Sequence, residues 1–420
     1  MRSFRLAVPA ALLAGLALVP AASAAGRTQD VTWHGTQIHL YDAQAAGRDG
    51  AGVVVAVLDS WIDTKHPDFE GRARGAVDCV GGSCRAGQVR DSCTHGTHVA
   101  GTVASSSFGV ARKAVVLPIQ VLTADSKGEC TGTPGDVAAG IRYGVAHGAK
   151  VLNLSLGPDV PGLASSSAIP AAVHQAAAAG VVVVFSAGNA DLPLAQAYGS
   201  DALVVAATGP SGQLASYSQH GTGVSVAAPG GEPTSSNTCT QAICITSLYP
   251  DGQYAVAAGT SMAAPHVSGI AALLFGQSLG RSEQNVRDRI TGTAHPLSGA
   301  GSGLVDAKAA LGVTTAKPRP TATTAPVPVV KARTSTPGTA KPATPSPTAT
   351  SKPKAATPAA VVPSSVPSTT PSSAPRALDG APTPDEIPLP LAAVAGVLVG
   401  LAGTGVLTLS RLARPRPTRH

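Results

Sequence analysis

The strongest constraint on the fold is a proline-rich stretch between residues 314 and 386. These 73 positions hold 16 of the 35 prolines in the 420-residue chain, and most of the others are Thr, Ser or Ala. A segment with so few large apolar side chains cannot bury enough surface to offset its conformational entropy. A single globular unit of 420 residues is therefore excluded, and we expect residues 314–386 to form a disordered linker extended by its prolines.

The N-terminus has the pattern of an export signal. Arg2 and Arg5 precede an apolar run over residues 6–19, and a small-residue A-x-A site follows at residues 22–24. This order of charged, apolar and small residues is typical of a secretory signal peptide. We expect residues 1–24 to be cleaved on secretion. The alternative is an uncleaved anchor helix, for which the apolar run is short.

The C-terminus has the pattern of a membrane anchor. Residues 391–409 carry no charge, and at about 1.5 Å per residue they are long enough to cross a bilayer. We therefore expect a transmembrane helix within residues 387–410; a buried core helix is the alternative. Four arginines lie in residues 411–420, and such positive tails stay in the cytoplasm. The body of the chain is then expected outside the cell, held at the membrane by a single span.

The positive charge of the chain does not belong to its central region. The formal net charge is +7, but residues 26–313 hold 16 Lys and Arg against 20 Asp and Glu, a net of −4. A nucleic-acid-binding domain would carry a basic surface of its own. We therefore expect no nucleic acid among the partners.

All cysteines lie within residues 26–313, in a domain that we expect to be exported. An even number of cysteines in such a domain predicts disulfides. Several pairings are open; closeness in sequence favours Cys79 with Cys84 and Cys239 with Cys244, which leaves Cys93 for Cys130. A zinc site is the weaker interpretation, because the chain has no Cys-x-x-Cys pair.

The folded domain, residues 25–313, has the pattern of alternating strands and helices. Continuous Val- and Leu-rich runs indicate strands buried on both faces of a parallel sheet. Helix-like stretches separate them, which predicts a doubly wound α/β fold with a mostly parallel sheet and helices on both faces. The expected strands are 52–59, 149–157, 180–189 and 202–207, and the expected helices include 135–148 and 168–179.

Three segments carry residues suited to acyl transfer by a serine. Asp59 ends a buried strand, His95 lies in SCTHGTHVAGT next to Gly96, and Ser261 lies in GTSMAAPHVSG. Acyl transfer needs a nucleophile, a base that takes its proton and an acid that orients the base. We assign these roles to Ser261, His95 and Asp59. Asn189, which follows another strand, offers a side-chain amide to the oxyanion.

The segment around Ser261 is predicted to begin a helix that extends to Phe275. Thr260 is expected to be its N-cap, so that Ser261 lies where the free N–H groups and the helix dipole favour an anion. Pro265 is expected in the first turn, the part of a helix that tolerates proline. Gly259 would let a substrate backbone approach closely.

These blocks resemble the subtilases, the subtilisin-like serine peptidases. The order Asp, His, Ser is theirs, and HGTHVAGTVAS, GTSMAAPHVSG, SAGN and VLNLSLG match the family's blocks. HPDF at residues 66–69 also matches, and the likeness covers residues 31–312. The resemblance implies an endopeptidase that acts on proteins or peptides, with substrate backbone paired to Ser155, Leu156 and Gly157. It implies no cofactor for catalysis. Many subtilases bind structural calcium, to which Asp30, Asp68 or Asp78 would contribute.

Two departures from the family qualify this resemblance. Trp61 replaces the glycine that usually follows the acid by two positions, which would either dampen activity or shape a subsite. No large prodomain fits between residue 24 and the domain. Signal peptide, proline-rich linker and terminal anchor resemble the mycosins of type VII secretion, so a secretion complex is an expected partner. The alternatives to an active peptidase are a silent scaffold in a membrane complex and a module that holds peptides uncut.

The other histidines of the domain are expected to be structural. His98 lies one helical turn from His95 and His266 lies in the serine helix, so both are predicted to pack between helices. His34, His39 and His147 have no motif support.

Overall fold

The computed structural model describes residues 6–7, 17–19, 31–126, 128–157, 167–195, 198–277 and 282–314. Its centre is an eight-stranded sheet in the order β12-β11-β10-β9-β3-β6-β4-β5. All neighbouring strands are parallel except β4 and β5 at the edge. The strands are β3 (Val54–Asp59), β4 (Val77–Asp78), β5 (Arg85–Ala86), β6 (Val115–Gln120), β9 (Val151–Leu154), β10 (Val182–Ser186), β11 (Leu203–Thr208) and β12 (Val226–Pro229).

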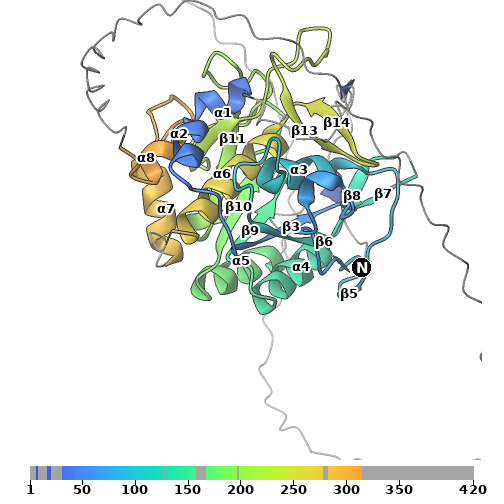
Figure 1. Ribbon diagram of the computed structural model, residues 1–420. Coiled ribbons are helices and arrows are strands. Elements are labelled where there is room, and N and C mark those ends of the chain that lie inside the picture. The colour runs from blue at the N-terminus through green and yellow to red at the C-terminus, as the bar shows by residue number, and fades with distance from the viewer. Residues whose placement is uncertain are drawn as a thin grey trace, which may run out of the picture. The chain divides into compact units, whose positions relative to one another are not determined.

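Helices cover both faces of this sheet (Figure 1). On one face lie α3 (His95–Ala104) and α6 (Thr260–Phe275), and on the other α4 (Pro134–Ala146) and α5 (Ala168–Ala178). The alternating side chains of β3 separate accordingly, since Val55 and Val57 join one core cluster while Ala56 and Leu58 join the other. Both faces are therefore buried, which explains the unbroken apolar runs and confirms the predicted α/β architecture.

Shorter elements complete the described part of the chain. A hairpin of β13 (Ile245–Tyr249) and β14 (Gln253–Ala257) packs against α3, and β7 pairs with β8. Two short strands within the predicted signal peptide pair with the edges of β8 and β14. These elements are β1 (Leu6–Ala7), β2 (Ala17–Val19), β7 (Thr123–Ala124), β8 (Cys130–Gly132), α1 (Trp33–Gln37), α2 (Leu40–Ala45), η2 (Pro67–Phe69), η3 (Gly199–Asp201), α7 (Glu283–Gly292) and α8 (Ala307–Ala310).

Strand β6, which contains Pro118, was not predicted from the sequence. The strand pairs with β3 along its whole length. On the side of β6 that faces away from β3, the N–H of Val116 donates to the carbonyl of Arg72. An N–H at position 118 would point to this same side, because it lies two residues further along the strand. Strand β4 pairs only with Ile119 and Gln120, so the missing N–H of Pro118 breaks no ladder bond.

The three disulfides have the expected pairing. Cys79 bonds Cys84, Cys239 bonds Cys244, and Cys93 bonds Cys130 across 37 positions. The last of these ties the loop just before His95 to strand β8.

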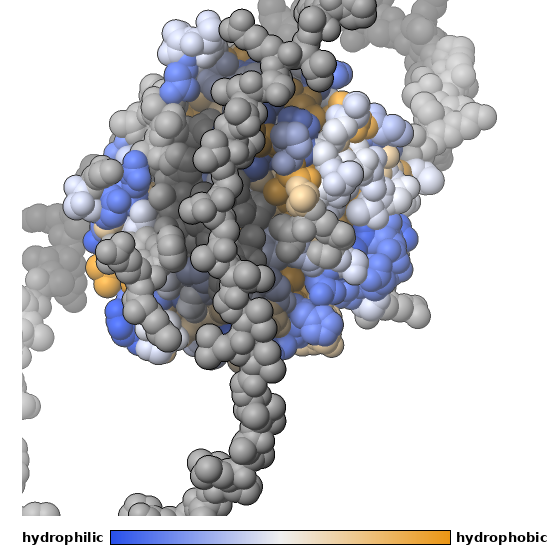
Figure 2. Space-filling view, turned by 180° about the vertical axis from the view of Figure 1, so that it is seen from behind, coloured by the Kyte–Doolittle hydropathy of each residue, from blue (hydrophilic) through white to orange (hydrophobic). Residues whose placement is uncertain are grey.

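On the face shown in Figure 2, the residues coloured by hydropathy are mainly hydrophilic or neutral, with hydrophobic ones in small groups.

The predicted terminal segments are not covered by these elements. Except for β1 and β2, the expected signal peptide lies outside the described residues, and so do the linker beyond residue 314, the helix at 387–410 and the basic tail at 411–420. Within the described ranges, no helix combines the length and the hydropathy needed to cross a membrane.

Candidate active site

Asp59 and His95 meet beneath the surface of the domain. Asp59 is the last residue of β3 and His95 the first of α3. His95 Nδ1 lies 2.8 Å from Asp59 Oδ1 and 3.0 Å from Oδ2, and the two residues are 4% and 0% exposed. Because a carboxylate only accepts hydrogen bonds, Nδ1 carries the proton and Nε2 is left as an acceptor. Sequence and geometry thus agree on a base oriented by a buried acid.

Gly96 explains how α3 approaches β3 so closely. Its N–H donates to Ser60 Oγ at 2.9 Å, and a Cβ on this residue would lie 2.7 Å from the Ser60 carbonyl oxygen. That distance is too short for any side chain at this position. Ser60 also donates its N–H to Asp59 Oδ1 at 2.7 Å, so it orients both the acid and the helix that carries the base. Sequence reasoning assigned no such role to Ser60.

Ser261 lies in the first turn of α6, as predicted, but the cap differs from the prediction. Gly259 occupies the N-cap and Thr260 is the first helical residue. Gly259 has φ 154°, which side chains rarely adopt, so glycine is needed here for its backbone conformation. The N–H groups of the first turn have no partner within the helix, and the N–H of Ser261 is among them.

Pro265 was expected in the first turn, but it is the sixth residue of α6. In a regular helix the N–H of residue 265 would bond the carbonyl of Ser261. Proline has no N–H, and the Ser155 hydroxyl donates to this carbonyl instead, at 2.8 Å. Asn153 Nδ2 in turn donates to Ser155 Oγ, and Ser268 donates to Asn153 Oδ1. The proline thus leaves an acceptor that ties the serine helix to the end of β9.

The amide of Asn189 has a fixed orientation. Its Oδ1 accepts from the N–H and from the hydroxyl of Thr260, both at 2.9 Å. The Thr260 hydroxyl accepts in turn from the N–H of Gly188 at 3.1 Å. With Oδ1 engaged, Nδ2 of Asn189 is the group that can donate to an anion near Ser261. Thr260, predicted as a cap, instead orients this amide.

The Ser261 hydroxyl donates to the Ser155 carbonyl at 3.2 Å, and in this state no hydrogen bond joins it to His95. Ser155 and Leu156 are buried and Gly157 is half-buried directly after β9. The candidate binding segment and the nucleophile are therefore in contact. Catalytic hydrogen bonds are commonly completed only when substrate binds.

Trp61 packs against a surface ion pair. Its ring lies 4.7 Å from the guanidinium carbon of Arg90, which forms two hydrogen bonds to Asp251 in the β13–β14 turn. The hydrogen bond from Arg90 lowers the pKa of Asp251. Trp61 does not prevent the hydrogen bond between Asp59 and His95.

Besides His95, the buried histidines of the described residues are His34, His66, His98 and His266, and the burial of the last two agrees with the packing role expected of them. His98 contacts the Ile245 carbonyl, and burial lowers its pKa to about 3. His266 donates from Nδ1 to the Met262 carbonyl and accepts from His34 at 2.9 Å; burial lowers the pKa of His266 to about 4. Burial and the neighbouring His266 also lower the pKa of His34. His147 is exposed at the end of α4.

Neither Asp68 nor Asp78, the two described acids expected to contribute to calcium binding, lies in a group of three His, Cys, Asp or Glu side chains that could hold a metal ion. Asp78 bonds Arg85 at 2.6 Å, Asp68 accepts from Tyr254, and Asp30 lies outside the described residues. Over the described ranges, His39, His295 and Asp306 are the one group of three His, Cys, Asp or Glu side chains close enough to share a metal ion.

Comparisons with known proteins point to one family. The Peptidase_S8 model, described as Subtilase family, matches residues 50–314. Thermitase of Thermoactinomyces vulgaris is 39% identical over 262 residues, covering 60% of this chain and 85% of thermitase. Subtilisin BL of Lederbergia lenta is 36% identical over 292 residues, covering 67% of this chain and 99% of the enzyme. A solved structure of a protease from Pseudoalteromonas arctica superposes with a TM-score of 0.58 at 29% identity, covering 67% of this chain and 96% of that one.

Proposed function

This chain belongs to the subtilase family of serine peptidases, and we propose that it cleaves peptide bonds with Asp59, His95 and Ser261 as its catalytic triad. The observation that carries the assignment is the buried contact of 2.8 Å between Asp59 and His95 Nδ1. It leaves Nε2 of His95 as the proton acceptor. Subtilases need no cofactor for this reaction.

The proposed reaction begins when the Ser261 hydroxyl leaves the Ser155 carbonyl and donates to His95 Nε2. The Ser261 oxygen attacks the peptide carbonyl while its proton passes to His95, and Asp59 stabilises the imidazolium. Asn189 Nδ2 and the N–H of Ser261 donate to the oxyanion. His95 then protonates the leaving amine, which departs and leaves an acyl-enzyme. Water, deprotonated by His95, releases the new carboxylate.

The substrate is expected to be an extended polypeptide. Residues 155–157 follow β9 without turning into a helix, and an extended peptide alongside them would extend the sheet. The hydrogen bond of 2.8 Å from the Ser155 hydroxyl to the Ser261 carbonyl holds this segment against the nucleophile. Substrate register and attack geometry are therefore fixed by the same contact.

Hydrolysis of a quenched fluorescent peptide library tests this function. Ser261→Ala removes the nucleophile and should abolish cleavage, a loss of at least about 1000-fold. Ser225→Ala is a matched control, because it deletes a hydroxyl that accepts from the N–H of Val204, outside the hydrogen-bond network around Ser261. It should keep activity within about tenfold of wild type. Residual cleavage by Ser261→Ala, or an equal loss in both variants, would contradict the assignment.

We also propose that the peptidase is secreted and remains anchored by residues 387–410, near a type VII secretion complex as in mycosins. The support is the sequence pattern of the termini and linker, since the structure does not describe these segments. Membrane fractionation of cells that express the full chain, and of cells that express a form ending at residue 386, tests the anchor. The anchor prediction is wrong if both forms sediment with membranes.

The alternative of a silent scaffold rests on Trp61. Its ring packs on Arg90, and Asp59 and His95 remain in contact, so the structure favours the active peptidase. We assign no calcium ligand to Asp78, because its two oxygens bond Arg85 and the N–H of Val80. Asp68 bonds Tyr254 through Oδ1 alone, and its buried Oδ2 has no hydrogen-bond partner among the described residues, so Asp68 remains a proposed ligand.

A further inference from the structure

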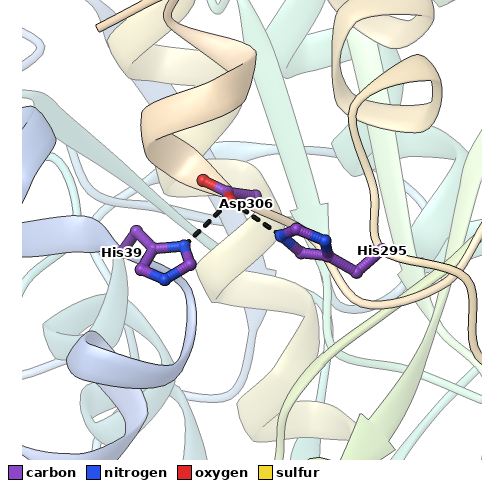
Figure 3. A group of neighbouring side chains, drawn as sticks. All are labelled: His39, His295 and Asp306. Carbon is purple, nitrogen blue, oxygen red and sulfur yellow. Dashed lines mark hydrogen bonds and ion pairs between the residues drawn. The ribbon is translucent and has the colours of Figure 1, made fainter. Parts of the chain in front are cut away.

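His39, His295 and Asp306 converge on one point at the side of the domain where α2, α7 and α8 pack together (Figures 1 and 3). Oδ2 of Asp306 lies 2.8 Å from His39 Nδ1 and 2.8 Å from His295 Nε2. The three ligand atoms all lie within 4.8 Å of one another. We propose that these residues bind one divalent transition-metal ion, with zinc as the best fit.

The backbone holds each of the three residues in place. The N–H of Ala307 bonds the carbonyl of Ile38, which fixes the position of His39 beside Asp306. His295 exchanges two hydrogen bonds of 2.8 Å with Leu304. The site is thus assembled by the fold, before any ion binds.

His39 also adopts a backbone conformation that needs an explanation. Its φ is 50°, in the left-handed region that residues other than glycine rarely occupy. Such strain persists where the surrounding structure maintains it, and often where a side chain has a functional direction. Here the conformation directs the imidazole of His39 at Asp306 (Figure 3).

Asp306 presents one carboxylate oxygen for a ligand. Oδ1 accepts from the N–H of Ala309 as the N-cap of α8, which leaves Oδ2 to the two imidazoles. The Asp306 side chain is 6% exposed and lies between two half-exposed imidazole rings.

The donor set selects the kind of metal. Two imidazoles and one carboxylate suit zinc and its neighbours, whereas calcium and magnesium prefer oxygen alone. Zinc bonds of about 2.1 Å place tetrahedral ligand atoms about 3.4 Å apart. Each N–O distance, now 2.8 Å, must then increase by about 0.6 Å, which rotation of the exposed rings allows. The proton on each bonded nitrogen moves to the other nitrogen of its ring, and water takes the fourth position.

The ion would join two distant parts of the chain. His39 belongs to the arm before the family match at residue 50, while His295 and Asp306 belong to its last segment. An ion that binds only the folded form stabilises it in proportion to the logarithm of its concentration. The proposal does not depend on the catalytic assignment.

Calorimetric titration with zinc chloride tests the site on the full, untagged chain, made inactive by Ser261→Ala to prevent self-cleavage. The parent should bind one ion per chain, and cobalt(II) should give the visible absorption of a low-coordinate site. Asp306→Asn retains the helix cap, since Asn caps as well as Asp. It and His295→Ala should each weaken zinc binding by at least about tenfold.

His174→Ala is the matched control, because His174 and Asp201 form a similar exposed pair, at 3.0 Å, without a second histidine. It should leave zinc affinity unchanged. Zinc should also raise the melting temperature of the parent and of this control, but not of Asp306→Asn. Absence of zinc binding to the parent, or equal binding to parent and Asp306→Asn, would overturn the proposal.

Discussion

Acidification should destabilise the folded state of this domain through its buried histidines. Burial lowers the pKa of His98 to about 3 and that of His266 to about 4, against 6.5 for a free imidazole. Below pH 6.5 the unfolded chain therefore binds protons that the folded chain does not accept. The stability that depends on these neutral rings is present above pH 6.5 and is lost as the pH falls toward the folded pKa values.

The magnitude follows from these two pKa values. At pH 5 an unfolded histidine is almost fully protonated, while His98 and His266 in the folded domain remain almost wholly neutral. Between pH 7 and pH 5 each ring then costs about 2 kcal/mol, and the two together about 4 kcal/mol if they titrate independently. A typical domain has a free energy of unfolding of about 5–15 kcal/mol. His34, whose pKa is also lowered by burial, adds to the loss.

Urea unfolding of the Ser261→Ala chain between pH 5 and 7.5 measures this effect. His98→Gln removes one titrating ring, so the slope of unfolding free energy against pH should fall by up to about 1.4 kcal/mol per pH unit. The slope is informative even if the variant is less stable at every pH. Ser268→Ala, which removes a buried hydroxyl that does not titrate in this range, should leave the slope unchanged. A slope that His98→Gln does not alter would refute the reasoning.

Three further predictions concern the active site. Asn189→Leu should lower kcat by about 100–1000-fold with little change in KM, because it removes an oxyanion donor; a change confined to KM would contradict that role. Gly96→Ala should lower kcat/KM at least about tenfold, because its Cβ would lie 2.7 Å from the Ser60 carbonyl oxygen, and unchanged kinetics would show that this contact relaxes freely. Ser155→Ala should cost about 1–3 kcal/mol in urea unfolding, because the Ser261 carbonyl loses its donor, and a smaller cost would show that water replaces it.

The layers of the fold could be predicted because a strand that is buried on both faces consists mainly of apolar residues, and these are visible in its own sequence. Strands β3, β10 and β11 are mainly apolar runs, and β9 is apolar except for Asn153, so each can be recognised from its own residues. Strand β6 was not predicted; whether a strand tolerates Pro118 depends on which of its sides is paired with β4. That information exists only once the sheet is assembled.

The candidate site was predicted residue by residue, but its supporting contacts were not. Motifs gave Asp59, His95, Asn189 and Ser261, and the structure brings Asp59 to His95 and Asn189 to the start of α6. The role of Thr260 depends on a contact across 71 positions, which no local pattern indicates. The same holds for His39, which lacks a motif and finds Asp306 across 267 positions.

Labelling with a fluorophosphonate probe, followed by peptide mapping, tests the central claim most directly. Such probes react with a serine only where a base and an oxyanion site activate it. We predict one adduct, on Ser261, in the wild-type chain, and its loss in His95→Ala. Labelling of another serine, or none in a chain shown by circular dichroism to be folded, would contradict the assignment of Asp59, His95 and Ser261 as an assembled triad.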